Sequence, residues 1–269
     1  PVIYGTMSVY ENLAFPLKCR QTPDDQIDKK VKEVAEILNL QDFLNNRAKG
    51  LTADQKQLIS LGRGLVREDV AAILMDEPLT VIDPDLKFRL RRKLKEINAK
   101  YKTTLIYVTH DQNEAMTFAD NIIVMDEGEV VQAGSPKDLF EKPQTTFVGY
   151  FIGSPAMNLY ECKADNSNQV SVGSNNIAVQ TNLGSTNTSN LKLGIRSEYI
   201  TVEQSSGPNT IHADIIEVED FGNYKLITAQ QDLIRIKAKV KREQEVPSEK
   251  VFLKFPAEHC CVYADNKLI

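Results

Sequence analysis

The chain has 269 residues, a formal net charge of -5 and 26% charged residues. Its length allows one large domain or two smaller ones with a sizeable core. The acidic balance argues against a general nucleic-acid binder, and no apolar stretch is long enough to span a bilayer. Its four cysteines have neither zinc-ligand spacing nor a disulfide-framework pattern, so we interpret them as core residues in a reducing cytosol.

The amino-terminal part predicts helices. The chain opens at Pro1 within a patterned segment, so we expect it to be a fragment that has lost an N-terminal part. A helix with an acidic first turn is predicted to start at residues 23–25, because apolar residues then recur at helical spacing over 27–38. A second helix is predicted near Leu40 or Gln41.

The segment Leu51–Gln57 is predicted to open a long helix that ends near Arg67. Thr52 and Gln55 have the spacing of a capping box, in which each side chain bonds a backbone N–H group of the other residue. A purely structural account of this segment therefore exists.

The short apolar run Ala71–Met75 is bounded by acids and Pro78, which predicts a buried parallel strand. In an open parallel sheet, ligand-binding sites lie just beyond the carboxyl ends of the strands. Asp76 and Glu77 therefore form a candidate Mg²⁺ and water site, in which Asp76 holds the metal and Glu77 orients or deprotonates water. The alternative interpretation is a strand that ends in a solvated acidic turn.

A loop follows, and Asp83 is expected to cap the next helix, whose outer face is rich in Lys and Arg and is interpreted as solvated. The next buried strand is predicted over Thr104–Thr109 and ends at His110. A further helix, an apolar strand over 121–125 and a hairpin-type turn over 126–129 come next. This alternation predicts a parallel α/β sheet.

The pattern changes at about residue 156. Residues 234–240 alternate strictly between apolar and polar, which predicts a half-buried strand, and 251–255 and 260–263 predict further short strands. We therefore predict a small all-β module of sandwich or barrel type over 156–269.

Three features together resemble the ATP-binding subunits of ABC transporters. In chain order they are Leu51–Gln57 at the start of a helix, Asp76-Glu77 at the end of a strand, and His110 at the end of the next strand. In that family the matching elements are the signature motif, Walker B with its catalytic glutamate, and the switch histidine. The run Ile73–Leu79 matches Walker B closely, and Tyr107–Asp111 matches the histidine loop.

The resemblance implies a P-loop NTPase-type parallel sheet, incomplete here because the Walker A part is missing, followed by an OB-like module of the TOBE type. Residues 1–155 would be the C-terminal part of the ATPase domain, with a helical subdomain over about 1–68 and the Walker B to histidine-loop region over 69–155. Residues 156–269 would be the regulatory β domain.

The resemblance also implies roles for single residues. Asp76 would hold Mg²⁺ on the phosphates of ATP, Glu77 would polarise the attacking water, and His110 would contact the γ-phosphate region. Asp83 would communicate with the opposite subunit, or it is only a helix cap. The residues that would approach the nucleotide of the partner subunit form the signature: Leu51, Thr52, Ala53, Asp54 and Gln55.

As a whole protein, such a subunit would hydrolyse ATP to energise import of a polyol or sugar: glycerol, glycerol 3-phosphate or a carbohydrate. Its partners would be a second ATPase subunit in a homo- or heterodimer, integral membrane permeases and, indirectly, a solute-binding protein, at the cytoplasmic face of the plasma membrane. The run Leu51–Leu79 with Thr80–Asp83 looks most like the paired ATPases of bacterial glycerol importers. The alternative is a non-catalytic or regulatory ATP-binding partner in a heterodimeric transporter.

Two departures from the family pattern qualify this picture. The phosphate loop is absent, since no glycine is followed by lysine, so we expect this chain alone to bind ATP poorly and to be inactive. The family's Leu-Ser-Gly-Gly-Gln is here Leu51-Thr52-Ala53-Asp54-Gln55. Asp54 would bring negative charge toward phosphate, which costs free energy unless the side chain turns away. One of two composite sites would then be weak, as suits a heterodimer.

Overall fold

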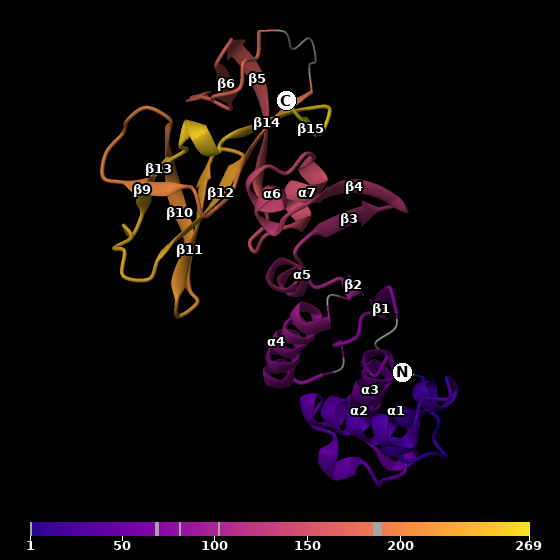
Figure 1. The fold of residues 1–269 in the computed structure, drawn as a ribbon. Helices are drawn as coiled ribbons and strands as arrows, with labels where there is room; N and C mark the ends of the chain where they lie inside the picture. Colours follow the sequence, from indigo (N-terminus) through magenta and orange to yellow (C-terminus); the bar gives the residue numbers. More distant parts are fainter. Residues whose placement is uncertain (1, 68–69, 81, 102, 185–189) are drawn as a thin grey trace. The chain divides into compact units, whose positions relative to one another are not determined.

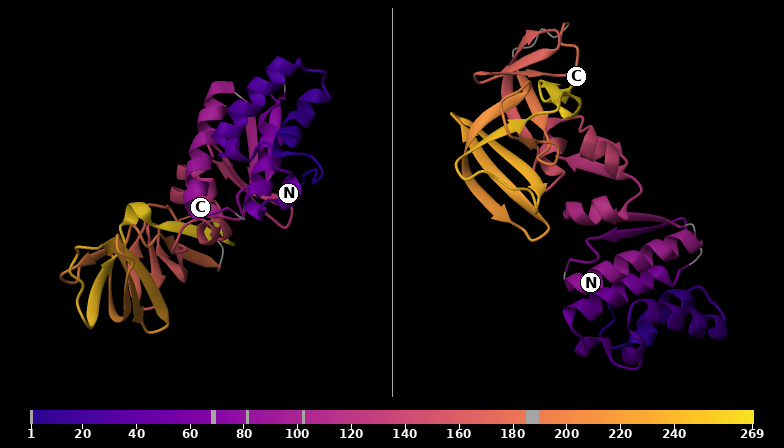
Figure 2. Two further views of the ribbon diagram at one scale, coloured as in Figure 1. Left: turned by 90° about the horizontal axis from the view of Figure 1, so that it is seen from below. Right: turned by 90° about the vertical axis from the view of Figure 1, so that its left-hand side faces the viewer.

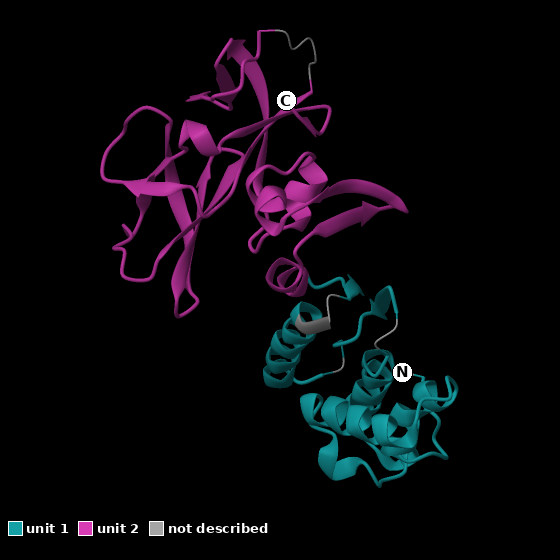
Figure 3. Ribbon diagram, viewed as in Figure 1, with its two compact units in different colours: residues 1–111 teal, residues 112–269 magenta. Residues whose placement is uncertain are grey.

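The structure is a computed structural model that describes residues 2–67, 70–80, 82–101, 103–184 and 190–269. The chain divides into two compact units, residues 1–111 and 112–269, and each is described by itself (Figure 3). The predicted boundary between the helical subdomain and the Walker B region falls at residues 68 and 69, which lie outside the described residues.

The first unit combines a helical cluster with two strands and a longer helix (Figure 1). Its elements are α1 (Val9–Lys18), α2 (Asp24–Ile37), η1 (Gln41–Phe43), η2 (Ala48–Gly50), α3 (Ala53–Leu65), β1 (Ala72–Asp76), α4 (Pro84–Tyr101) and β2 (Thr104–Val108). Helices α1, α2 and α3 contact one another, and Leu13, Leu38 and Ile59 are fully buried between them. Gly62 permits this approach, because a Cβ there would lie 2.5 Å from Leu13 Cδ2 and 3.0 Å from Leu38 Cδ1.

Two helix starts show how local sequence fixes the ends of this cluster. Thr52 and Gln55 form the predicted capping box at the start of α3, with the Thr52 N–H donating to Gln55 Oε1 at 3.1 Å. Ser8 and Glu11 form the same motif at the start of α1. The Ser-x-x-Glu spacing was a sequence signal for this helix that our prediction did not use.

The helix predicted near Leu40 or Gln41 is wrong, because only the single 3₁₀ turn η1 forms there. Asn39 has a φ of 54°, and the N–H of Leu40 returns to the carbonyl of Ala35 at 2.8 Å. This left-handed termination of α2 buries Leu40 and redirects the chain before another helix can propagate.

Strands β1 and β2 pair in parallel, from Ala72 opposite Thr104 to Asp76 opposite Val108, which confirms their predicted relationship. Met75 is buried as predicted, whereas Leu74 on the opposite face is 75% exposed. The predicted burial of this strand is therefore wrong at Leu74 in the part of the chain that the structure describes. Its partner on β2, Ile106, is 47% exposed, so this apolar face is exposed in the part of the first unit that the structure describes.

The second unit begins with helices and a hairpin and continues as strands (Figure 1). Its first elements are α5 (Gln112–Phe118), β3 (Ile122–Asp126), β4 (Glu129–Gly134), α6 (Pro136–Glu141) and α7 (Thr146–Phe151). Glu127 and Gly128 both have positive φ, at 47° and 85°, as a type I′ hairpin turn requires. The predicted hairpin is therefore confirmed.

The remaining strands build an all-β region, as predicted. They are β5 (Asn158–Asn166), β6 (Gln169–Val172), β7 (Asn175–Ala178), β8 (Leu191–Ile195), β9 (Thr201–Glu203), β10 (Thr210–Asp220), β11 (Tyr224–Gln231), β12 (Ile234–Lys241), β13 (Lys250–Lys254), β14 (Cys261–Ala264) and β15 (Lys267–Leu268), with the 3₁₀ turn η3 (Ala257–His259). They form two sheets, in the orders β12-β11-β10-β13-β9 and β15-β14-β8-β5-β6-β7. Residues of both sheets share one apolar core in a barrel-like arrangement (Figure 2).

Arg196, just after β8, links the all-β region to helices α6 and α7 of the same unit. It is 1% exposed, and its guanidinium donates to the carbonyls of Phe140, Gly149 and Ile152. Burial lowers the pKa of Arg196. The helix ends that supply the carbonyls carry partial negative charge, which favours the buried cation.

The cysteines are all free. Cys162 and Cys260 are buried, and burial raises their pKa to about 11 and about 12, which confirms them as inert core residues. Cys19 is exposed, so the core interpretation is wrong for that residue. None of the helices in the described parts of the chain has the length and apolar character needed to cross a bilayer.

Candidate functional site

Asp76 and Glu77 lie where the sequence predicted, at the carboxyl end of β1. The N–H of Glu77 donates to the carbonyl of Val108 at 2.9 Å, which extends the β1–β2 pairing by one residue. Glu77 has a φ of 44°, in a region that non-glycine residues with long side chains rarely adopt. Such backbone conformations cluster at functional sites.

The structure brings Glu77 and His110 together. His110 Nδ1 lies 2.8 Å from Glu77 Oε1, and the two side chains are 71% and 45% exposed. The hydrogen bond from His110 lowers the pKa of the Glu77 carboxyl, and the hydroxyl of Thr80 contributes to the same shift. Because an ionised carboxylate only accepts, the hydrogen of the short contact belongs to His110 Nδ1. The pair is thus a carboxylate held ionised and oriented by an imidazole.

Thr80 is a member of this cluster that the sequence analysis did not single out. Its Oγ1 lies 3.3 Å from Glu77 Oε2 and 3.1 Å from the Glu77 carbonyl oxygen. The intervening Pro78 favours a turn, which was the sequence signal that residue 80 returns to residue 77. Both carboxylate oxygens of Glu77 therefore have a donor, one from each side.

The end of β1 also fits a bound divalent cation. Magnesium usually takes one or two carboxylates and completes its shell with water and phosphate oxygens. Asp76 and Glu77 offer adjacent carboxylates of that chemistry, and Asp76 is exposed. Among the residues described, no group of three or more His, Cys, Asp or Glu side chains is arranged to hold a metal. The carboxylates of Asp76 and Glu77 therefore suit a magnesium ion whose other ligands are water and phosphate oxygens.

The segment Leu51–Gln55 lies at the start of α3. Thr52 is the N-cap, and its hydroxyl donates to the carboxylate of Asp54. The side chain of Asp54 therefore turns back toward the N-cap residue Thr52 and does not extend away from the helix. The Thr52–Gln55 capping box and the Thr52–Asp54 bond therefore stabilise the start of α3.

Asp83 caps α4 as predicted, because the N–H of Asp85 donates to Asp83 Oδ1 at 3.0 Å. Its proposed role toward an opposite subunit stays a prediction. Val81, in the same predicted loop, lies outside the described residues.

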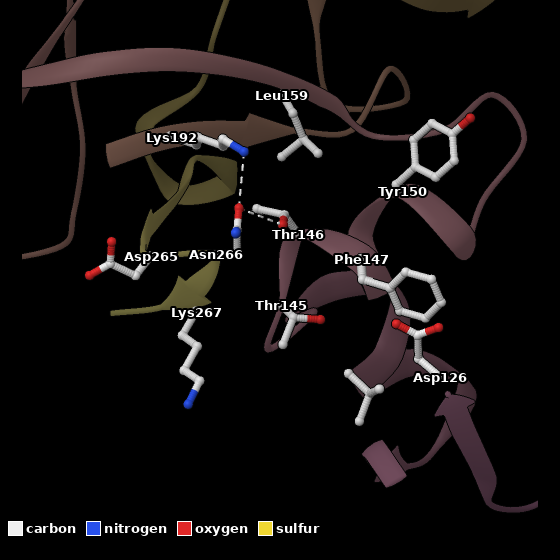
Figure 4. Close-up of a pocket in the computed structure, with 11 residues that line it drawn as sticks. Asp126, Thr145, Thr146, Phe147, Tyr150, Leu159, Lys192, Asp265, Asn266 and Lys267 are labelled. Carbon is white, nitrogen blue, oxygen red and sulfur yellow. Dashed lines mark hydrogen bonds between the residues drawn. The ribbon is translucent and has the colours of Figure 1, made fainter. Parts of the chain in front are cut away.

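A groove of about 480 Å³ in the second unit is a further concave site (Figure 4). Asn266 Oδ1 accepts from Lys192 Nζ at 2.9 Å and from Thr146 Oγ1 at 3.1 Å. The N–H of Thr146 also donates to the carbonyl of Asn266 at 3.0 Å. These contacts fix the β14–β15 hairpin to the start of α7, so the groove has a structural explanation.

Comparison with known proteins gives close relatives. A multiple sugar-binding transport ATP-binding protein, MsmK of Streptococcus mutans, is 37% identical over 275 residues, which cover 94% of this chain and 72% of that protein. The oligosaccharides import ATP-binding protein MsmX of Bacillus subtilis is 40% identical over 223 residues, 82% of this chain and 59% of that protein. An sn-glycerol-3-phosphate import ATP-binding protein, UgpC 3 of Agrobacterium fabrum, is 40% identical over 217 residues, 81% of this chain and 60% of that protein.

No protein-family model matches the chain. The chain spans between 42% and 72% of the length of the first relatives that it matches.

Proposed function

Because this chain belongs to the family of ATP-binding subunits of ABC importers for sugars and glycerol phosphate, we propose that its whole protein hydrolyses ATP to drive such import. The single observation that carries the catalytic part of the proposal is the 2.8 Å contact between Glu77 and His110. A regulatory subunit freed of hydrolysis has no chemical need for a carboxylate base that a histidine keeps ionised.

Each residue of the cluster has a distinct part in the proposed reaction. Bound Mg²⁺ would neutralise charge on the ATP phosphates, and Asp76 would hold it from the end of β1. Glu77 would accept a proton from the attacking water, for which its carboxylate must be ionised and fixed in orientation. When its ring is doubly protonated, His110 would donate from Nδ1 to Glu77 and from Nε2 to the γ-phosphate. Thr80 would position the other oxygen of Glu77.

The start of α3 would serve the nucleotide of a second ATPase subunit. A helix N-terminus presents N–H groups and a partial positive charge to phosphate. Ala53 and Asp54 occupy two positions at which the family has glycine, so the site that they line would be the weaker of a pair. This departure favours a heterodimer, and it is the observation that supports the alternative of a regulatory partner.

The remaining partners follow from the same proposal. Membrane permeases would select the solute with a solute-binding protein, and this subunit would act at the cytoplasmic face of the membrane. The solute would be a sugar, glycerol 3-phosphate or glycerol, and the D-loop region Thr80–Asp83 favours the glycerol-importer pair. Residues 156–269 would be an OB-like regulatory module.

The decisive test is Glu77→Gln in the complete transporter. Loss of the base should lower ATP turnover by about 10²- to 10⁴-fold while ATP stays bound. The matched control is Glu127→Gln, because Glu127 is also an acid with positive φ but lies in the β3–β4 turn. Turnover unchanged by Glu77→Gln would refute the catalytic assignment. The same assay with and without the second ATPase subunit separates a homodimer from a heterodimer.

A further inference from the structure

The groove that is lined by α7 and the β14–β15 hairpin has two chemically different sides. It has a volume of about 480 Å³, and its lining residues all belong to the second unit. In Figure 4, the aromatic side chains of Phe147 and Tyr150 lie on one side, whereas Lys192, Asn266 and Lys267 lie on the other. The hydrogen bonds of Asn266 explain how the polar side is held, but the aromatic side takes no part in them.

The aromatic side of the groove is open to solvent. Tyr150 is 66% exposed, and it follows Phe147 by three residues in α7, so both side chains lie on one face of this helix. The ring of Phe147 stacks on that of Phe151, with the centroids 5.7 Å apart and an interplanar angle of 8°. Phe151 thus supports Phe147 from one face. Exposed apolar surface beside a groove is typical of a ligand-binding site.

The polar side of the groove presents hydrogen-bond donors in fixed positions. Asn266 Oδ1 accepts from Lys192 Nζ and from Thr146 Oγ1, and these two bonds orient the amide, because an ammonium group can only donate. The two Nδ2 hydrogens of Asn266 remain for a ligand, since no described residue accepts from them. Asp265 and Asn266 have φ angles of 49° and 66°, as in a type I′ turn, so the backbone here is held tightly as well.

We propose that this groove binds a carbohydrate through one pyranose ring. One face of such a ring is made of C–H groups, whose partial positive charge packs favourably on the negative face of an aromatic ring. Its hydroxyl groups both donate and accept, so they can pair with the amide of Asn266, the ammonium of Lys267 and the carboxylate of Asp126. Asp126 is exposed and lines the groove, and its charge disfavours a purely anionic ligand. The site is independent of the proposed ATPase activity, because none of its residues belongs to the cluster around Glu77.

The test uses the full chain and NMR titrations with maltose, lactose, sucrose, glycerol and sodium phosphate. The side-chain amide signals of Asn266 and the ring signals of Tyr150 should shift saturably with at least one of the three disaccharides. Glycerol has hydroxyl groups but no ring face, so it should bind at least about tenfold more weakly at equal hydroxyl concentration. Phosphate at constant ionic strength should give no saturable shift. The proposal is overturned if no disaccharide saturates these signals, if glycerol binds equally well, or if phosphate alone saturates them.

Variants test the two sides of the groove separately. Tyr150→Ala should weaken disaccharide binding about tenfold, whereas Tyr150→Phe keeps the ring and should bind nearly as well as the original chain. Asn266→Asp keeps an oxygen for Lys192 and Thr146 but removes the Nδ2 donors, so it should also weaken binding about tenfold. The matched control is Phe221→Ala, because Phe221 is a similarly exposed aromatic residue, stacked on Tyr224 in the β10–β11 hairpin, and its loss should leave binding unchanged. Unchanged binding in either Tyr150→Ala or Asn266→Asp would overturn the proposal.

Discussion

His110 Nδ1 lies 2.8 Å from Glu77 Oε1, although the two residues are 33 positions apart in the chain. The parallel pairing of β1 with β2 produces this contact, because it brings the carboxyl ends of both strands to one edge. Glu77 follows β1 directly, and His110 is the second residue after β2. The contact therefore depends on strand register as well as on residue identity.

The first prediction concerns the acidity of Glu77. His110→Ala removes the hydrogen bond that contributes most to the lowered pKa of Glu77, so this pKa should rise toward its usual range. A carboxylate whose pKa is lower folded than unfolded stabilises the fold at pH above the unfolded pKa, and this stability is lost as the pH falls through the folded pKa. At pH above the unfolded pKa, His110→Ala should therefore lose the stability that the ionised Glu77 carboxylate gives to the fold.

Carboxyl ¹³C NMR measures this pKa directly. His212→Ala is the control, because His212 lies in the second unit, stacked on Phe252, and should leave Glu77 unchanged. An unaltered Glu77 pKa in His110→Ala would mean that the contact does not form in solution.

The second prediction separates the two donors to Glu77. Thr80→Val keeps the branched shape but removes the hydroxyl at 3.3 Å, so the pKa of Glu77 should rise by less than in His110→Ala. In the complete transporter, the acid limb of the ATPase pH profile should move the same way. Thr80→Ser should preserve both values, and a serine variant that behaves like valine would contradict the positioning role.

The sequence predicted most of the site for identifiable reasons. Asp76 and Glu77 follow a short apolar run, and His110 follows the next one, so strand ends could be placed from hydrophobicity alone. The capping box at Thr52 is a local pattern and was also found. That Glu77 bonds His110 was not predictable, because it depends on the pairing register of two strands far apart in sequence.

Other features depended on contacts that sequence periodicity does not carry. The end of α2 at Asn39 is a left-handed termination, and an apolar pattern cannot distinguish the residues beyond it from a new helix. The burial of Leu40 comes from packing of the completed cluster. Arg196 could be expected to lie at a surface, and only the structure shows the carbonyl oxygens that surround it.

The third prediction concerns packing in the helical cluster. Gly62→Ala should destabilise the cluster by about 1–3 kcal/mol, because the new methyl group overlaps Leu13 and Leu38. Gly64→Ala is the matched control in the same helix, since among the described residues its Cβ would meet Ile73 Cγ2 alone, at an ordinary 3.5 Å. Alanine is the better helix former, so the control should be neutral or stabilised by up to about 1 kcal/mol. Native-state hydrogen exchange of α1–α3 measures both, and equal destabilisation would disprove the close-approach argument.

The last prediction concerns the charge at the start of α3. In the complete transporter, Asp54→Asn removes a negative charge but keeps an oxygen that can accept from Thr52, so the cap should survive. If the nucleotide phosphates of a partner subunit approach this helix end, removal of the like charge should raise ATP hydrolysis there, by about two- to tenfold at low ionic strength.

Salt distinguishes this electrostatic effect from a change in packing, because the gain should shrink as ionic strength rises. Replacing Ala53 and Asp54 together by glycine should raise hydrolysis further, since it also restores close backbone approach. Steady-state ATPase rates at several salt concentrations measure both effects. If neither variant changes the rate, then the charge of Asp54 does not act on the phosphates, and this site does not limit turnover.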